Sequence, residues 1–143
     1  GNFIRTRAQL DYLEEPDCFH DIFGHVPMLA HPGMARAMEH VGRVGLRAIA
    51  AGHGDWVARL YWHTVEFGLC REGGEVRILG AGLASSFGEA RVSLEDPTLE
   101  RRRFSVAEAT ATPYRHDAMQ PLYFVADSVE AAVEAILTAE APQ

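Results

Sequence analysis

Two histidines five residues apart, His20 and His25, stand in a stretch whose side chains could bind a metal ion. Residues 12–27 read Y-L-E-E-P-D-C-F-H-D-I-F-G-H-V-P, so that acidic side chains flank the pair within an otherwise apolar run. Imidazole is a common metal ligand, but five residues of a regular α-helix turn the chain by about 500°, which would leave the two rings about 140° apart. A shared ion therefore requires that the helix change direction between them.

The residues around His25 favour such a change. Gly24 leaves helical geometry at little cost, and Pro27 disfavours the helical conformation in the residue before it. We expect the helix to end at Phe23 or Gly24 and His25 to lie on the turn beyond it, from which its ring can reach back toward His20. Two histidines do not complete a metal site, so a third ligand must come from elsewhere in the chain.

Glu66 is the candidate third ligand. A helix is expected over residues 56–69, with Asp55 as its N-cap, because apolar side chains recur there at helical spacing. Glu66 is the only acid between Asp55 and Glu72, and its neighbours are apolar and aromatic. A carboxylate in such surroundings must be paired, protonated or bound to a cation. A salt bridge to a distant arginine is the alternative to a metal site.

Two imidazoles and one carboxylate are the ligand set of non-haem Fe(II) oxygenases, in which they occupy one face of the ion and leave the opposite positions open. His20, His25 and Glu66 supply this set, which also serves catalytic zinc. The neighbouring acids Asp17 and Asp21 can accept the second N–H of a ligating histidine and so fix the orientation of its ring.

The composition limits the kind of protein. With 143 residues, of which 48% are apolar, we expect a single domain over residues 1–143. A net charge of -7 argues against nucleic acid as a partner. No apolar run approaches the roughly 20 residues of a membrane span, and no secretory signal is visible. Cys18 and Cys70 are too few for a disulfide scaffold, and we expect a cytoplasmic monomer.

The remaining pattern predicts a mainly α fold with roughly two to four short strands. Apolar periodicity and capping residues predict helices over residues 32–51, after Ser86, after Ser105 and after Asp127. Gly73 and Gly74 predict a small hairpin or edge strand over residues 72–79, and a further strand is expected over residues 122–125. The basic run at residues 101–103 is expected to be a solvated turn.

Four segments resemble the pterin-dependent aromatic amino acid hydroxylases. They are residues 15–27 (E-P-D-C-F-H-D-I-F-G-H-V-P), 59–69 (R-L-Y-W-H-T-V-E-F-G-L), 80–89 (G-A-G-L-A-S-S-F-G-E) and 120–125 (Q-P-L-Y-F-V). They occur in the family's order and at fitting separations, so the resemblance covers nearly the whole chain. It implies the helical catalytic domain of that family. It also implies a monooxygenase that uses Fe(II), O2 and a tetrahydropterin, such as tetrahydrobiopterin, to hydroxylate the ring of an aromatic amino acid.

The resemblance also implies roles for individual residues. His20, His25 and Glu66 would bind the iron, while Arg5 would bind the carboxylate of the substrate. Other residues match positions around these groups: Trp62 as an aromatic pocket wall, Ser85 and Glu89 around the substrate, Tyr61 near the iron, and Asp21 and Ala58 at the pterin.

The chain departs from the family pattern in two respects. Asp21 stands where the family usually has Glu near the pterin, which shortens the acid by one methylene. The family's domain is also considerably longer, and its stretch with a pterin-stacking Phe has no counterpart in this sequence. The chain is therefore either an unusually compact enzyme or part of a longer protein.

The substrate is expected to depend on His116. Counting back from Gln120 places His116 where a position in the family is apolar in phenylalanine and tryptophan hydroxylases and acidic in tyrosine hydroxylases. A polar side chain there fits a phenolic substrate, because a buried hydroxyl requires a partner. We expect hydroxylation of L-tyrosine to L-DOPA, with L-phenylalanine to L-tyrosine as the alternative. For His116 the alternative is a solvent-facing loop histidine. For the whole protein the alternatives are a zinc hydrolase with the same ligands and a non-catalytic relic that binds an amino acid.

Overall fold

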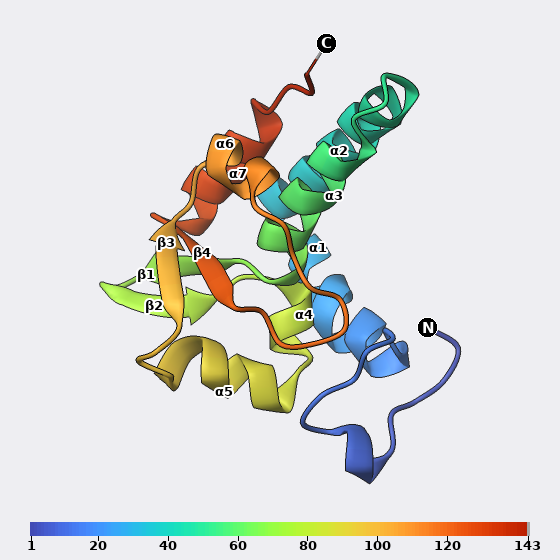
Figure 1. The fold of residues 1–143 in the computed structure, drawn as a ribbon, viewed down its shortest axis with the longest axis vertical. Coiled ribbons are helices and arrows are strands. Elements are labelled where there is room, and N and C mark those ends of the chain that lie inside the picture. The colour runs from blue at the N-terminus through green and yellow to red at the C-terminus, as the bar shows by residue number, and fades with distance from the viewer. Residues whose placement is uncertain (143) are drawn as a thin grey trace.

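The structure is a computed structural model that describes residues 1–142. A group of helices forms one side of the molecule, and a small sheet with α5 beneath it forms the other (Figure 1). The helices and strands are α1 (Val26–Leu29), α2 (Pro32–Ala50), α3 (Gly54–Tyr61), β1 (Leu69–Glu72), β2 (Glu75–Ile78), α4 (Ala81–Ala84), α5 (Phe87–Glu95), β3 (Glu100–Arg103), α6 (Val106–Ala111), β4 (Leu122–Ala126) and α7 (Val129–Leu137).

Three further helical segments are not α-helical: the 3-10 turn η1 (Arg7–Gln9) and the π-helical segments η2 (His20–His25) and η3 (Trp62–Glu66). The predicted predominance of helix with a few short strands is confirmed. Within residues 1–142, no helix combines the length and apolar character that a membrane crossing would require.

The longest helix, α2, organises the helical side. It packs against α3 and α7, and α3 packs in turn against α6. Its buried apolar side chains fall at spacings of three and four residues, as on one face of an amphipathic helix: Met34, Ala37, Val41, Val44 and Ala48. The predicted helix over residues 32–51 is therefore confirmed to within one residue.

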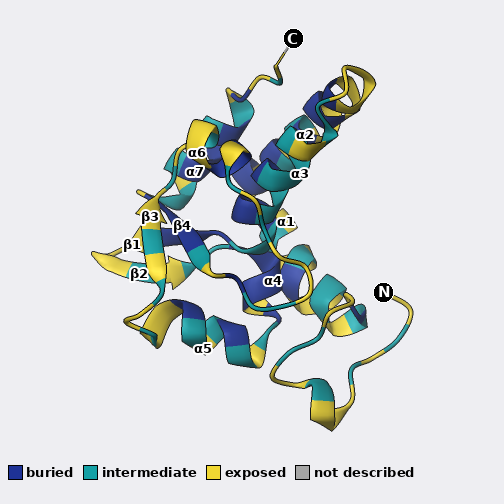
Figure 2. Ribbon diagram, in the orientation of Figure 1, coloured by how far each residue is buried: buried dark blue, intermediate teal, exposed yellow. Residues whose placement is uncertain are grey.

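The four-stranded sheet has the order β2-β1-β4-β3, with β1 antiparallel to β2 and with β4 parallel to both β1 and β3. The predicted strand over residues 122–125 is β4, one of the two inner strands, whose Tyr123 and Phe124 are each 1% exposed. The predicted hairpin is also present, since β1 and β2 meet at Gly73 and Gly74. Figure 2 shows that β4 and α4 are buried over most of their length, whereas β1 is buried only in its first half.

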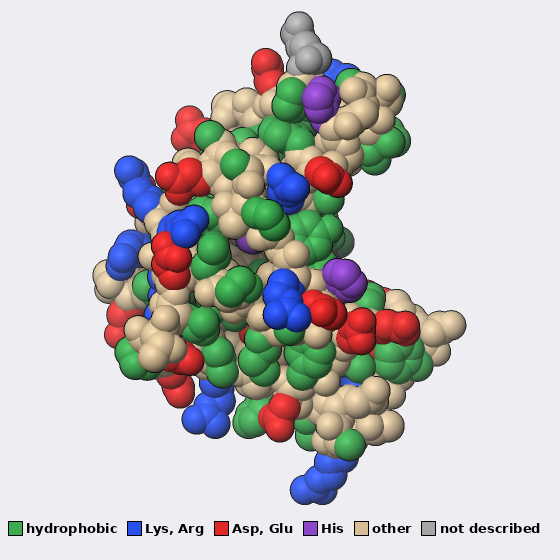
Figure 3. All heavy atoms as spheres, viewed as in Figure 1, with side chains coloured by type: hydrophobic (Ala, Val, Ile, Leu, Met, Phe, Trp, Pro, Cys, Tyr) green, Lys and Arg blue, Asp and Glu red, His purple; other side chains and the backbone are tan. Residues whose placement is uncertain are grey.

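The basic run at residues 101–103 is not a solvated turn, so that prediction was wrong. It belongs to β3, which pairs with β4 through its backbone. Arg101 donates to the backbone oxygens of Ser93 and Asp96. Charged side chains are usual on an edge strand, where they discourage pairing with another chain. Figure 3 shows acidic and basic side chains intermixed on the face in view, with no broad basic patch.

Helix starts were predicted with mixed success. Ser86 and Ser105 cap α5 and α6, because their hydroxyl oxygens accept from the backbone N–H groups three residues later. Asp55 was expected to be an N-cap but lies in the first turn of α3, whose N-cap is His53. The side chain that caps α7 is Ser128, one residue after Asp127.

Candidate metal centre and adjoining cavity

His20 and His25 form the two ends of the π-helical segment η2, which continues directly into α1. The predicted helix end at Phe23 or Gly24 was therefore wrong. A π-helical turn is one residue wider than an α-helical turn, with hydrogen bonds from i to i+5, so residues five apart share one face. The two imidazole rings stand perpendicular with their centroids 4.6 Å apart. The five-residue spacing of His20 and His25 is therefore accommodated by a wider, π-helical turn rather than by the end of the helix.

Gly24 has a different role from the one predicted. It is buried, and a Cβ at this position would lie 2.7 Å from the backbone oxygen of Ala81. That distance is shorter than van der Waals contact, so any side chain here would push η2 away from α4. Gly24 thus permits the close approach of two segments that both contribute to the site.

Glu66 reaches the two histidines from the end of the second π-helical segment, η3, which continues α3. Its Oε1 lies 3.0 Å from Nε2 of His25, and its Oε2 lies 3.6 Å from Nε2 of His20. All three side chains are largely buried. Among residues 1–142, these three form the one group of histidine, cysteine or acidic side chains able to hold a metal ion, with ligand atoms within 4.8 Å of one another.

Electrostatics distinguishes the two histidines in the absence of an ion. The hydrogen bond to Glu66 raises the pKa of His25, whereas burial lowers the pKa of His20. Burial, reinforced by the charge of Glu66, raises the pKa of the nearby Tyr61 hydroxyl far above its usual range. Two imidazole nitrogens and one carboxylate, held close together and shielded from water, fit Fe(II) and also fit zinc.

Ser85, rather than an acid, holds the ring of His20. Its Oγ lies 2.8 Å from Nδ1 of His20. This kind of contact was predicted for Asp17 or Asp21, and the structure places both elsewhere. Asp17 accepts from the backbone N–H of His20 and from Arg5. Asp21 pairs with the amino group of Gly1.

Arg5 and Asp17 form a buried ion pair beside the metal ligands. The guanidinium donates from Nε and Nη2 to the two carboxylate oxygens, at 2.9 and 2.7 Å, and from Nη1 to the backbone oxygen of Ser85 at 2.5 Å. These bonds hold the pKa of Asp17 far below its usual range. The position of Arg5 is consequently fixed before any ligand binds.

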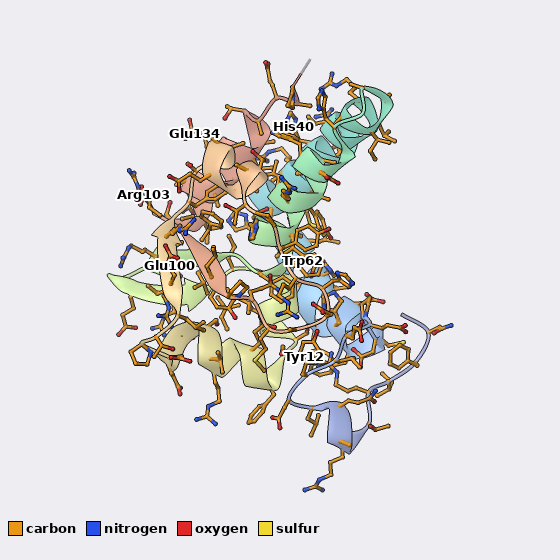
Figure 4. The ribbon with its side chains drawn as sticks, viewed as in Figure 1. Tyr12, His40, Trp62, Glu100, Arg103 and Glu134 are labelled. Carbon is orange, nitrogen blue, oxygen red and sulfur yellow. The ribbon has the colours of Figure 1, made fainter. Side chains whose placement is uncertain are left out.

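A cavity of about 240 Å³ opens next to His20 and Glu66. Each of the five residues predicted to contact the substrate lines it: Arg5, Trp62, Ser85, Glu89 and His116. Figure 4 shows Trp62 and Tyr12, two residues of its lining, far from Glu100 and Arg103 on β3. The structure thus brings together residues that are widely separated in the sequence.

The aromatic rings of Trp62 and Phe67 line the cavity, and Tyr114 packs on Trp62 without being part of the lining. Trp62 stacks on Tyr114 with 4.3 Å between centroids and lies 4.9 Å from Phe67. Tyr114 was not singled out from the sequence, although it lies two residues before His116. His116 is exposed at the cavity, where its backbone oxygen accepts from the hydroxyl of Tyr12.

The two residues expected at the pterin are placed differently. Asp21 lies on η2 and Ala58 on α3, and neither belongs to the lining of the cavity. The side chain of Asp21 is 46% exposed. Within residues 1–142 these two side chains do not form an enclosed pocket for a pterin ring, in contrast to the metal ligands, which are assembled.

Comparison with known proteins shows the family that this chain matches. The family model described as biopterin-dependent aromatic amino acid hydroxylase matches residues 1–139. The phenylalanine-4-hydroxylase of Caulobacter vibrioides is 47% identical over 137 residues, which are 96% of this chain and 47% of that protein. The tyrosine 3-monooxygenase of Bos taurus is 42% identical over 127 residues, which are 88% of this chain and 25% of that protein.

Solved structures give the same result. The phenylalanine hydroxylase of Chromobacterium violaceum with bound iron(III) and oxidised cofactor 7,8-dihydrobiopterin is 44% identical, with a TM-score of 0.86 over 94% of this chain and 49% of that one. The structure of the same Chromobacterium violaceum enzyme with iron and phenylalanine bound is 40% identical, with a TM-score of 0.85 over 99% of this chain and 49% of that one. The chain spans about half the length of the phenylalanine hydroxylases that it matches.

Proposed function

The chain belongs to the biopterin-dependent aromatic amino acid hydroxylases, and from this premise we propose that it carries the iron site and amino acid pocket of a phenylalanine 4-monooxygenase. The observation that carries the proposal is the convergence of His20, His25 and Glu66 beside a cavity that Arg5 also lines. The ligands would bind an iron ion, and the cavity would receive the substrate next to it.

We propose phenylalanine rather than tyrosine as the substrate. This reverses the main expectation from the sequence, which was tyrosine, in favour of the alternative given there. The bacterial phenylalanine hydroxylases are 41 to 49% identical to this chain, and the matched tyrosine 3-monooxygenases are 41 and 42% identical. The exposure of His116 also weakens the argument for tyrosine. An exposed imidazole offers a phenolic hydroxyl little beyond what water already offers.

The residues of the chain contribute binding, orientation and exclusion of water. A bound Fe(II) ion would supply the means to activate O2 for insertion of one oxygen atom into the ring. Arg5 would bind the carboxylate of the amino acid through the N–H groups that its bonds to Asp17 and Ser85 leave free. The Trp62 ring would pack against the aromatic ring of the substrate, and the largely buried carboxylate of Glu66 would hold the ion partly shielded from solvent.

The proposal for the cofactor is limited to its class. We propose a tetrahydropterin, as in the family, but Asp21 and Ala58 form no enclosed site for it, and no step of the reaction is assigned to them. Their role at the pterin stays a prediction, as does the assignment of residues 1–143 to a single catalytic domain.

The test is product formation by the iron-loaded chain. After anaerobic loading with Fe(II), the protein receives tetrahydrobiopterin, O2 and either L-phenylalanine or L-tyrosine, and chromatography measures L-tyrosine or L-DOPA. We expect more product from phenylalanine. Glu66→Ala should abolish it, whereas Glu72→Ala, at an exposed position of β1, should not. Absence of product from the wild-type chain would contradict the proposal, and hydrolytic activity without O2 would support a zinc enzyme.

A further inference from the structure

Glu89 is a buried acid that the proposed reaction has not yet used. Only 2% of its surface is exposed, yet it lines the cavity. Its Oε1 accepts from the backbone N–H of Gln120 at 2.8 Å and from the hydroxyl of Tyr123 at 2.9 Å. Its Oε2 has no hydrogen-bond partner within residues 1–142. One oxygen is thus anchored and the other is available.

The available oxygen of Glu89 faces open volume. The described polar atoms that are both enclosed and without a partner are Nδ1 of His25 and Nε1 of Trp62, and Oε2 of Glu89 is not one of them. Because the residue as a whole is buried and borders the cavity, the space that Oε2 reaches is the cavity. A ligand in the cavity can therefore contact this oxygen.

A cation faces the same space. A guanidinium carries five N–H donors, and Arg5 uses three of them on Asp17 and Ser85, which leaves two. Two adjacent serines connect the charged groups: the backbone oxygen of Ser85 accepts from Arg5, and the hydroxyl of Ser86 accepts from the backbone N–H of Glu89. The cavity lining thus presents a positive and a negative group, which complement the two charges of an amino acid.

Other acids of the lining are less suited to bind an ammonium group. Glu66 belongs to the metal ligands, and Glu14 and Glu15 are exposed, so water competes for them. Arg115, the other arginine of the lining, is exposed and paired with Asp117. Among the described lining residues, Glu89 is therefore the buried acid that is free to act.

We propose that Oε2 of Glu89 accepts a hydrogen bond from the α-ammonium group of the amino acid whose carboxylate binds Arg5. The inference rests on the proposed function, because it takes an aromatic amino acid as the ligand. Burial raises the pKa of Glu89, and a bound ammonium favours the charged carboxylate. The contact selects for an α-amino acid over an aromatic acid that lacks the amino group.

Calorimetry with two ligands tests the contact. L-phenylalanine and 3-phenylpropanoate share the ring and the carboxylate, but only the former has an ammonium group. In the Fe(II)-loaded chain without O2, Glu89→Gln should weaken binding of L-phenylalanine about 10- to 100-fold, as expected for loss of a charge-assisted hydrogen bond, and should leave 3-phenylpropanoate unchanged. The Gln side-chain oxygen can still accept from Gln120 and Tyr123, so the variant keeps its anchoring bonds.

Tyr123→Phe is the matched control, because it removes one anchoring bond of Glu89 without removing the carboxylate. We expect it to retain discrimination between the two ligands. Glu89→Gln that weakens both ligands equally, or neither, would overturn the inference and leave the proposed function standing. Equal binding of both ligands by the wild-type chain would also overturn the inference and leave the proposed function standing. This outcome does not depend on the folding of any variant. If the wild-type chain binds neither ligand, the proposed amino acid pocket itself is wrong.

Discussion

Oγ of Ser85 lies 2.8 Å from Nδ1 of His20 and also 2.8 Å from the backbone oxygen of Ala81. A serine hydroxyl has one hydrogen, and the carbonyl of Ala81 can only accept, so Ser85 donates to Ala81 and accepts from His20. The proton of His20 therefore resides on Nδ1, which leaves the lone pair of Nε2 directed at the metal site. The structure thus specifies the tautomer that metal binding requires.

Ser85→Ala should weaken metal binding about 10- to 100-fold, the usual effect of removing a hydrogen-bond partner of a ligating histidine. The affinity for Co(II), which is stable in air, can be measured by calorimetry. Ser93→Ala is the control, because Ser93 is also buried and bonds to a backbone oxygen in α5, outside the site. Unchanged affinity in Ser85→Ala would mean that packing alone orients His20.

Gly82→Ala should also weaken metal binding, but through steric contact. A Cβ at Gly82 would lie 3.1 Å from Oε2 of Glu66 and 2.9 Å from Cζ of Phe67. Overpacking of this kind typically costs about 1–3 kcal/mol, and the displaced carboxylate should bind the ion less well.

Gly42→Ala provides the matched control for Gly82→Ala. A Cβ at this position of α2 would have no atom within 4 Å, so the substitution should stabilise the helix by up to about 1 kcal/mol. Urea unfolding and Co(II) titration of both variants measure the two effects. Equal metal affinity in Gly82→Ala and the wild-type chain would show that Glu66 has room to move.

The sequence was sufficient to single out the three candidate metal ligands that the structure brings together, because residue type and context restrict what they can do. Glu66 stands in an apolar segment and the two histidines in a motif, so each pattern is local. The helices and the hairpin were predicted for the same reason, since periodicity, capping serines and turn glycines are properties of short segments.

Features that depend on distant partners were not predictable. The pairing of Ser85 with His20 spans 65 residues, and no local pattern marks it. No local pattern predicted the π-helical turns at both segments, and the close approach of Gly24 in η2 to the backbone of α4 was equally hidden in the sequence. Strand β3 was missed because backbone pairing with β4, not the character of its arginines, makes it a strand.

His116→Val tests the expectation that this residue selects the substrate. Because His116 is exposed, the substitution should change the ratio of kcat/KM for phenylalanine to that for tyrosine by less than about threefold, below the roughly 10- to 200-fold effect of a pocket contact. Steady-state assays with both amino acids measure the ratio. A tenfold or larger shift toward phenylalanine would restore His116 as a determinant of specificity.

Glu89→Gln should change how stability depends on pH. Burial raises the pKa of Glu89 above its ordinary value of 4.5, so the folded state holds this proton more tightly than the unfolded state does. The contribution of Glu89 to stability therefore falls as pH rises from about 4.5 through the raised pKa, and it is constant above that. Gln cannot ionise, so the variant should gain stability relative to the wild-type chain across this range.

Urea unfolding of the metal-free chain at several pH values between about 4 and 8 measures this difference. Glu95→Gln is the control, since it makes the same chemical change at an exposed position of α5. A stability difference between Glu89→Gln and the wild-type chain that stays constant over the whole range would mean that the pKa of Glu89 is the same in the folded and unfolded states. That result would contradict the raised pKa that burial gives Glu89.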